Sequence, residues 1–308
     1  MNISGFFVVN KPRDWTSHDV VQKVRRLLGK GVRVGHLGTL DPIAQGVLVL
    51  CVGKATRLAQ YLQAWDKEYQ VVLKLGEATD TQDATGRVTS TASLEGITEE
   101  RIREAFRRFE GPIVQIPPMY SAKKVKGRPL YRLARQGIEV SRPPKAVVIH
   151  RLSVERVALP WVTFSAHCST GTYMRTLCHD VGQALGVGGH LYALTRTRTG
   201  PFRLEDAVSV DELVRLAQRG ELEKALHGLR DAMQDMPPLQ VSRLGGAKMR
   251  RGQPLVLGDL EKQPPDAPEG TVYRVETSAG TLLGLARRVL GSGGQALFRV
   301  ERVLLEVS

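Results

Sequence analysis

The sequence is poor in features that mark disulfide-rich, metal-ribbon and membrane-spanning proteins. Its three cysteines, Cys51, Cys168 and Cys178, form no CxxC pair, so they predict neither a disulfide scaffold nor a zinc ribbon. No stretch approaches the roughly 20 uninterrupted apolar residues that span a bilayer. Residues 1–12 lack the charged start, long apolar centre and cleavage site of a signal peptide. We therefore expect a soluble cytoplasmic protein that does not span a membrane.

Motifs for nucleotide, metal and hydrolase chemistry are also missing. The segment 46–54 ends in Gly-Lys, but its spacing is wrong for a phosphate loop, and Ala55 stands where that loop needs Ser or Thr. Residues 186–189 lack the third glycine of a dinucleotide fingerprint. The Cys-His-Asp run at 178–180 and His190 are close in sequence, but neighbouring helical positions point in different directions. No Gly-x-Ser-x-Gly elbow occurs. We expect no cofactor and no metal.

What the chain does have is an excess of positive charge. It carries 44 Lys and Arg against 31 Asp and Glu, a formal net charge of +13. This sign favours a polyanionic partner, either a nucleic acid or an anionic membrane. With 308 residues, 42% of them hydrophobic, the chain can bury one large core or two ordinary ones.

Hydrophobic periodicity predicts helices and strands in mixed order. Helices are expected at residues 16–28, 55–65, 98–109, 173–185, 210–229 and 242–251, with a short one starting near Pro129. Strands are expected at residues 47–52, 69–75, 145–157, 161–168, 271–276, 280–289 and 296–307. Residues 77–86 are expected to form a polar loop. Because the helices are not spaced as regular βαβ crossovers, we expect an α+β fold with a largely antiparallel sheet.

Two segments interrupt this order. The Pro237-Pro238 pair predicts a boundary between a larger domain, residues 1–236, and a small, mostly β module, residues 237–308. From 123 to 145 the chain has eight Lys or Arg and one acid, with several Pro and Gly residues. This composition predicts a mobile basic insertion over about residues 115–145.

Asp41 is the candidate reactive group. It lies in the loop Gly-His-Leu-Gly-Thr-Leu-Asp-Pro, residues 35–42, and the apolar strand at 47–52 follows directly. A lone acid on a rigid turn backed by buried structure is suited to act as a nucleophile or base. Lys11, at the end of an earlier strand, suits a phosphate or the support of this loop. Asp-Pro is also a common turn start, so the loop alone does not decide between the two roles.

Two further segments carry candidate site residues. In residues 169–177 a strand turns into a helix start that presents Tyr173 and Arg175. Helix N-termini attract anions, and Arg175 is able to form a bidentate pair with a carboxylate such as Asp41. Tyr69 begins a strand, where a tyrosine is more often a core residue than a substrate contact. Only the fold can bring these distant segments together.

In their order and spacing these segments resemble the TruB-type tRNA pseudouridine synthases. The similarity is collinear and spans residues 5–12, 35–48, 67–69, 79–83, 117–122, 171–175 and 188–194. The C-terminal module is similar to a PUA domain, a small RNA-binding β-barrel. The resemblance therefore implies a pseudouridine synthase fold, with a mainly antiparallel mixed sheet flanked by helices, and a PUA-like β-barrel domain.

The resemblance also implies a reaction and a set of roles. The uridine at position 55 of tRNA, in the T loop, is converted to pseudouridine by base flipping and attack of Asp41. Tyr69 matches the residue that stacks on the base, and Arg175 matches the residue that pairs with the carboxylate. Lys11 matches a lysine that supports the loop. Positions that match the nucleotide pocket or an RNA-loop contact are His36, Tyr173 and Leu194. The expected partner is tRNA, bound at its T-arm by a monomer.

Three alternatives remain open from the sequence. A non-catalytic RNA-binding protein uses the basic surface but has no use for the Asp41 loop. A related synthase acts on another RNA. A lyase or glycosidase uses Asp41 with Asp80 or Asp83, which requires paired carboxylates at a fixed separation.

Overall fold

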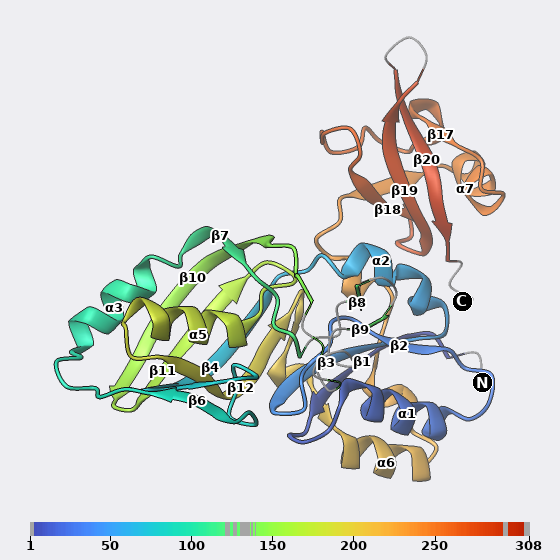
Figure 1. Cartoon of the computed structure of the whole chain (residues 1–308). Coiled ribbons are helices and arrows are strands. Elements are labelled where there is room, and N and C mark those ends of the chain that lie inside the picture. The colour runs from blue at the N-terminus through green and yellow to red at the C-terminus, as the bar shows by residue number, and fades with distance from the viewer. Residues whose placement is uncertain are drawn as a thin grey trace. The chain divides into compact units, whose positions relative to one another are not determined.

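The computed structural model describes residues 3–120, 124–125, 128–129, 136, 138, 140–291 and 295–304 (Figure 1). The chain divides into two compact units. The large unit comprises Phe7–Cys51 and Ala59–Leu226, and the small unit comprises Met1–Phe6, Val52–Leu58 and His227–Ser308. Within the described ranges, no helix is long and apolar enough to cross a bilayer.

A mixed sheet of eleven strands, counted over the described residues, is the centre of the large unit. Its main path runs β14 (Val208–Ser209), β1 (Gly5–Lys11), β3 (Ala44–Val52), β12 (Gly189–Thr199), β4 (Lys67–Leu75), β11 (Trp161–Cys168), β10 (Lys145–Ala158) and β7 (Gly111–Gln115). The strands β2 (Val34–His36), β13 (Phe202–Arg203) and β15 (Leu226–His227) pair with β3, β12 and β1. Most described pairings are antiparallel, whereas β12 runs parallel to β3, and β1 to β14. The expected α+β class with a mainly antiparallel sheet is confirmed.

Helices cover the sheet where its strands bury apolar side chains. Strand β4 alternates buried and half-buried residues, as a strand with one face on a core does. Helix α5 (Met174–Ala184) packs on β12 and β4, and α3 (Glu99–Arg107) packs on β10 and against α5 (Figure 1). Helix α1 (Ser17–Leu28) contacts α6 (Val210–Gln218) and β2.

The start of α1 follows from its sequence. Thr16 is the N-cap: its hydroxyl accepts from the amide of Asp19 at 3.1 Å, and the Asp19 carboxylate accepts from the amide of Thr16 at 2.9 Å. This reciprocal capping box satisfies two of the unpaired donors at the helix start. The expected helix at residues 16–28 is confirmed.

Three local expectations were wrong. Helix α6 ends at Gln218 and does not reach residue 229, because Gly220 takes a positive φ of 71°. The amides of Gly220 and Glu221 then donate to the carbonyls of Ala217 and Leu216, a Schellman ending. The region expected as a helix at 55–65 is the 3₁₀ helix η1 (Gly53–Leu58) followed by the short α2 (Ala59–Leu62). The expected loop at 77–86 begins with β5 (Glu77–Thr79), which pairs with β6 (Val88–Thr91).

Thirteen of the 31 residues of the expected basic insertion lie outside the described residues. Within it, β8 (Lys124–Val125) and β9 (Arg128–Pro129) form an antiparallel pair. The helix expected near Pro129 falls on residues that the structure does not describe.

The small unit contains a second sheet. Its order is β16 (Pro238–Val241), β18 (Val272–Thr277), β19 (Leu282–Leu290), β20 (Ala296–Val303) and β17 (Leu255–Val256), and α7 (Arg243–Arg250) contacts several of these strands. Its core is a cluster of fully or almost fully buried side chains: Leu239, Val241, Met249, Leu255, Tyr273, Val275, Leu283, Ala286 and Phe298. These residues form the mostly β module that the sequence predicts, whereas the boundary at residue 237 stays a prediction.

Candidate active site

The Asp41 loop is fixed by hydrogen bonds on both sides of the carboxylate. The Ser17 hydroxyl donates to the Leu40 carbonyl at 3.1 Å and accepts from the Leu40 amide at 2.8 Å. Lys11 is fully buried, and its amine donates to backbone carbonyls that include Pro42 at 3.4 Å. These contacts hold the residues just before and just after Asp41, so the loop is preorganised.

Arg196, on β12, holds the same loop from the other side. It is 1% exposed, and its Nε donates to the Val47 carbonyl at 2.7 Å. Its Nη2 donates to the carbonyl of Gly38 at 3.0 Å, and Nη1 lies 3.5 Å from that of Thr39. A side chain at Gly46 would place its Cβ 2.2 Å from the Arg196 carbonyl oxygen, so this close approach of β3 and β12 requires glycine. The Arg196 side chain therefore connects β3 to the Asp41 loop.

Arg175 forms an ion pair with Asp41. It stands in the first turn of α5, where Gln115 fixes the start of the helix by accepting from the Tyr173 amide at 2.9 Å. The Arg175 side chain is 4% exposed, and its Nη2 lies 2.9 Å from Asp41 Oδ2. Its Nη1 lies 3.4 Å from Asp83 Oδ2, and Asp83 is itself buried. Arg175 thus bridges two carboxylates, one of which is Asp41.

The electrostatics of Asp41 are set by this enclosure. Its side chain keeps 35% of its surface open to the cavity, but the protein surrounds it on the other sides. Burial raises the pKa of the Asp41 carboxyl, the Arg175 guanidinium opposes that rise, and the nearby charge of Asp83 adds to it. Arg175 is therefore the main group that favours the ionised, nucleophilic form.

Asp41 lies in a cavity of about 250 Å³. Its lining consists of residues from the Asp41 loop, β4, the start of α5 and β12: Gly38, Thr39, Leu40, Asp41, Lys67, Tyr69, Thr170, Gly171, Thr172, Tyr173, Met174, Arg175, Leu194 and Arg196. Burial raises the pKa of the Tyr69 phenol, which keeps it protonated at neutral pH. Among the described residues that line the cavity, Asp41 is the only acid.

Lys67 supplies a third buried positive charge at this cavity, beside Arg175 and Arg196. Its amine donates to the Thr170 hydroxyl at 3.0 Å, to the Gln63 carbonyl at 3.2 Å and to the Trp65 carbonyl. Burial lowers its pKa to about 8. The amine is therefore mostly charged at pH 7, and its three donors all have protein acceptors.

The structure brings most of the expected site residues together. Five of the seven line the cavity: Asp41, Tyr69, Arg175, Tyr173 and Leu194. Lys11 does not reach it and holds backbone carbonyls beneath the loop. His36 ends β2, is half-buried and does not line the cavity, and its Nδ1 has no hydrogen-bond partner in the described part of the chain.

Sequence reasoning missed three contributors to this site. Arg196 lay outside the matched segments, and the strand β12 that presents it was not predicted. Lys67 lay in a matched segment, residues 67–69, but was given no role. Asp83 was considered only as a second carboxylate of a glycosidase. It accepts instead from the hydroxyls of Thr81 and Thr85 and orients Arg175. The paired carboxylates across a substrate that a glycosidase needs are not found among the described lining residues.

The sequence matches two family models in succession. Residues 25–174 match the TruB family pseudouridylate synthase N-terminal domain, and residues 175–236 match the tRNA pseudouridylate synthase B C-terminal domain. Among curated relatives, tRNA pseudouridine synthase B of Syntrophus aciditrophicus (strain SB) is 41% identical over 98% of each chain. The enzyme of the same name from Moorella thermoacetica (strain ATCC 39073 / JCM 9320) is 43% identical over 98% of this chain and 99% of its own length.

Solved structures show the same likeness across both units. A chain in the crystal structure of a Cbf5-Nop10-Gar1 complex matches with a TM-score of 0.77 and 27% identity, over 98% of this chain and 85% of that chain. A chain in an H/ACA RNP bound to a substrate RNA containing 2'-deoxyuridine matches with a TM-score of 0.75 and 26% identity, with the same coverage of both chains.

Proposed function

The chain belongs to the TruB family of pseudouridylate synthases, and from this membership we propose that it converts uridine 55, in the T loop of tRNA, to pseudouridine. The observation that carries the proposal is the ion pair of 2.9 Å between Arg175 and Asp41 in a cavity lined by an aromatic ring. A non-catalytic RNA-binding protein has no need for such a pair.

The reaction is an isomerisation in which one bond to the base replaces another. The glycosidic bond from the ribose C1′ to N1 of uracil breaks, and a bond from C1′ to C5 forms. The proton on C5 leaves, and N1 ends protonated, so atoms and electrons balance without a co-substrate. Asp41 supplies the nucleophilic oxygen for this exchange, directed either at the ribose carbon or at the base. Arg175 keeps that oxygen ionised before attack.

The target base must leave its stack before it reaches Asp41. Extrusion of a nucleotide costs a few kcal/mol. Stacking of the base on the Tyr69 ring returns about 1–3 kcal/mol, which offsets much of that cost. Tyr173 and Leu194 line the same cavity and supply further contacts for the base or its sugar. The cavity of about 250 Å³ holds far more than one water, and we assign it to the extruded base.

The remaining partner assignments follow from the same premise. Phosphate attraction by a chain of net charge +13 supplies much of the affinity for the T-arm. The basic insertion at about 115–145 and the PUA-like module at 237–308 are assigned to RNA binding. We expect the protein to act as a monomer in the cytoplasm.

The direct test uses the purified protein, an unmodified tRNA transcript and no added cofactor. Pseudouridine is mapped along the product at single-nucleotide resolution. We expect one modified position, uridine 55, and no product from a transcript that has cytidine there. Modification elsewhere, with position 55 unchanged, would support a related synthase of another specificity. Tight binding without any pseudouridine would support an RNA-binding protein instead.

A further inference from the structure

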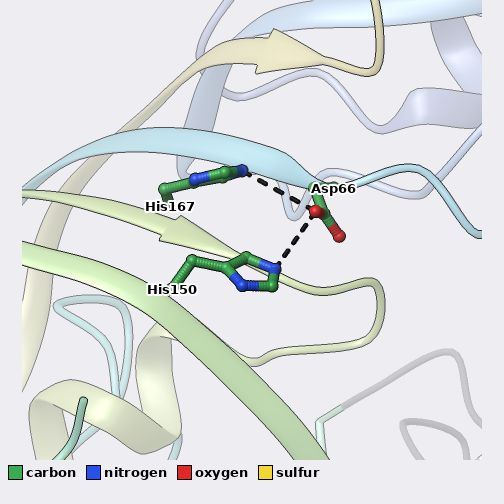
Figure 2. A group of neighbouring side chains, drawn as sticks. All are labelled: Asp66, His150 and His167. Carbon is green, nitrogen blue, oxygen red and sulfur yellow. Dashed lines mark ion pairs between the residues drawn. The ribbon is translucent and has the colours of Figure 1, made fainter. Parts of the chain in front are cut away.

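We propose that Asp66, His150 and His167 form a binding site for a divalent transition metal of the zinc class. The three side chains meet although they are far apart in sequence: Asp66 precedes β4, His150 lies on β10 and His167 on β11 (Figure 2). Both imidazole rings are directed at one carboxylate, with Nε2 of His150 at 3.1 Å and Nε2 of His167 at 3.7 Å from Asp66 Oδ2.

The spacing of these atoms suits tetrahedral coordination. Zinc binds nitrogen and oxygen ligands at about 2.0–2.2 Å, which places neighbouring ligand atoms about 3.3–3.6 Å apart. The two distances to Asp66, 3.1 and 3.7 Å, lie just below and just above that range, and all three ligand atoms lie within 4.8 Å of one another. The His150 and His167 rings lie 4.7 Å apart at 45°, so neither ring blocks the other. A small adjustment of side-chain angles completes the site.

Paired strands of the sheet hold the two histidines, and a backbone hydrogen bond holds Asp66. Strands β10 and β11 pair antiparallel, with a register shift between Ile149 and Arg151 that places His150 at an irregular position. His167 pairs with Glu68 in the register of β11 and β4. Asp66 is anchored by its carbonyl, which accepts from the Gly200 amide at 3.0 Å. Ligands held by paired strands lose little freedom on binding, which favours affinity.

The site lies on the opposite face of the sheet from the cavity. Because side chains alternate along a strand, Lys67 and Tyr69 point to the buried face of β4, whereas Glu68 points to the other. His167 shares the face of Glu68, and each of the three ligands keeps more than a third of its side chain exposed. A metal here is therefore reached from solvent and does not enter the reaction at Asp41.

The ligand set selects the class of ion. Two imidazoles with one carboxylate suit zinc and its neighbours, whereas magnesium and calcium prefer oxygen ligands only. Three protein ligands leave a fourth position for water, which the exposure of the site permits. Because the three ligands come from three segments, a bound ion cross-links them and stabilises the fold in proportion to its affinity.

The test is a titration of the tag-free protein with Zn²⁺ by calorimetry, with Co²⁺ as a spectroscopic probe. We expect one site per chain, visible absorption of tetrahedral Co²⁺ and a Tm that rises with Zn²⁺ concentration. His150→Ala, His167→Ala and Asp66→Asn each remove one ligand. Loss of a residue that only hydrogen-bonds to a metal ligand lowers metal affinity about 10- to 100-fold. Each of these variants loses a ligand itself, so we expect a larger drop in Zn²⁺ affinity. His18→Ala removes an exposed histidine outside the cluster and serves as the matched control.

The outcomes separate the site from incidental binding. Loss of the calorimetric site and of the Co²⁺ absorption in all three variants, but not in His18→Ala, supports the proposal. Unchanged stoichiometry and affinity in the three variants, or no site in the wild type, overturns it. The metal-free double variant His150→Ala/His167→Ala is expected to retain tRNA modification. Failure of the metal-site proposal is therefore distinguishable from failure of the proposed function.

Discussion

The two faces of β4 and β11 place charged groups in opposite environments. On the cavity face, Lys67 is 5% exposed. On the other face, Glu68 and His167 keep about a third of their side chains exposed. These three residues belong to neighbouring positions of the same two paired strands. A single step along a strand therefore changes a buried charge into a hydrated one.

This difference in exposure decides which charged side chains need several partners. Taking an ionised group out of water is expensive, so buried charges persist only with several partners. Arg175 has two carboxylates and two carbonyls as partners, and Arg196 has three carbonyls. Charges on the outer face need no such arrangement. Substitutions on the two faces are therefore expected to differ in their effects.

The largest effect among variants that keep the Asp41 carboxylate is expected for Arg175→Met. Without the guanidinium the carboxylate loses its ion pair, and we expect the single-turnover rate to fall about 10²- to 10³-fold, as for the loss of one strong electrostatic contact in a transition state. The Kd for tRNA should change by less than about threefold, because Arg175 is almost fully buried. Arg175→Lys, which keeps a charge, is the control for folding. A loss of affinity with normal turnover would contradict this role.

The same variant is expected to displace the pH profile. Asp41 must be ionised to react, so the rate rises with pH as its carboxyl titrates. Burial raises the pKa of Asp41, and Arg175 opposes that rise, so removing the arginine moves the acidic limb to higher pH. Single-turnover rates of wild type and Arg175→Met, measured across the acidic range, test this. Coincident limbs would show that another group controls the rate.

A smaller effect is expected for Arg196→Lys. An ammonium group cannot reach Val47 and Gly38 together as the guanidinium does, so the Asp41 loop loses part of its support. We expect turnover to fall about tenfold, the loss that a modest misplacement of a reacting group produces.

Arg198→Lys is the matched control for Arg196→Lys on the same strand. A register shift of β12 separates the two positions, and Arg198 pairs with Glu68 at 2.8 Å while 34% of its side chain is exposed. Its replacement should change turnover by less than about twofold, as expected for an exposed pair. Equal losses in the two variants would remove the distinction between the faces.

The smallest effect concerns stability and Lys67→Met. The folded-state pKa of Lys67 is lowered from its usual 10.5 to about 8, so between these values the unfolded chain holds a proton that the folded chain has lost. In that window this lysine makes wild-type stability rise with pH, by at most about 1.4 kcal/mol per unit. Well below pH 8, where both states hold the proton, the free-energy cost of burying the charged Lys67 amine is fully present. Denaturant unfolding should show a flatter pH dependence in Lys67→Met, and parallel curves would contradict the buried charge.

Sequence patterns predicted the regular parts of this fold because those parts follow simple periods. The helix from Ser17 to Leu28 has an apolar stripe and a capping box, and β4 alternates cleanly. Strand β12 was missed because its buried face includes polar residues, among them Arg196 and Thr199, which hide the period of two. The early end of α6 depends on Gly220. The helical pattern continues past this one glycine, so the pattern alone does not show that the helix ends there.

For the site, the sequence supplied the segments but not the supporting contacts. Asp41, Tyr69 and Arg175 were expected from their motifs, and the fold places all three on one cavity. Arg196 joins residues more than a hundred positions away, and no local pattern encodes such a contact. The cluster of Asp66, His150 and His167 was missed for the same reason, because only strand pairing brings it together.

We propose that the carboxylate of Asp41, held ionised on a fixed loop, performs the chemistry. Asp41→Asn tests it most directly, because it replaces one oxygen and keeps the shape of the side chain. Wild type and variant are incubated with the same unmodified tRNA transcript, and binding and pseudouridine at position 55 are measured in parallel. We expect unimpaired tRNA binding by Asp41→Asn and no pseudouridine. Pseudouridine formed by the variant at a rate near that of the wild type would contradict it.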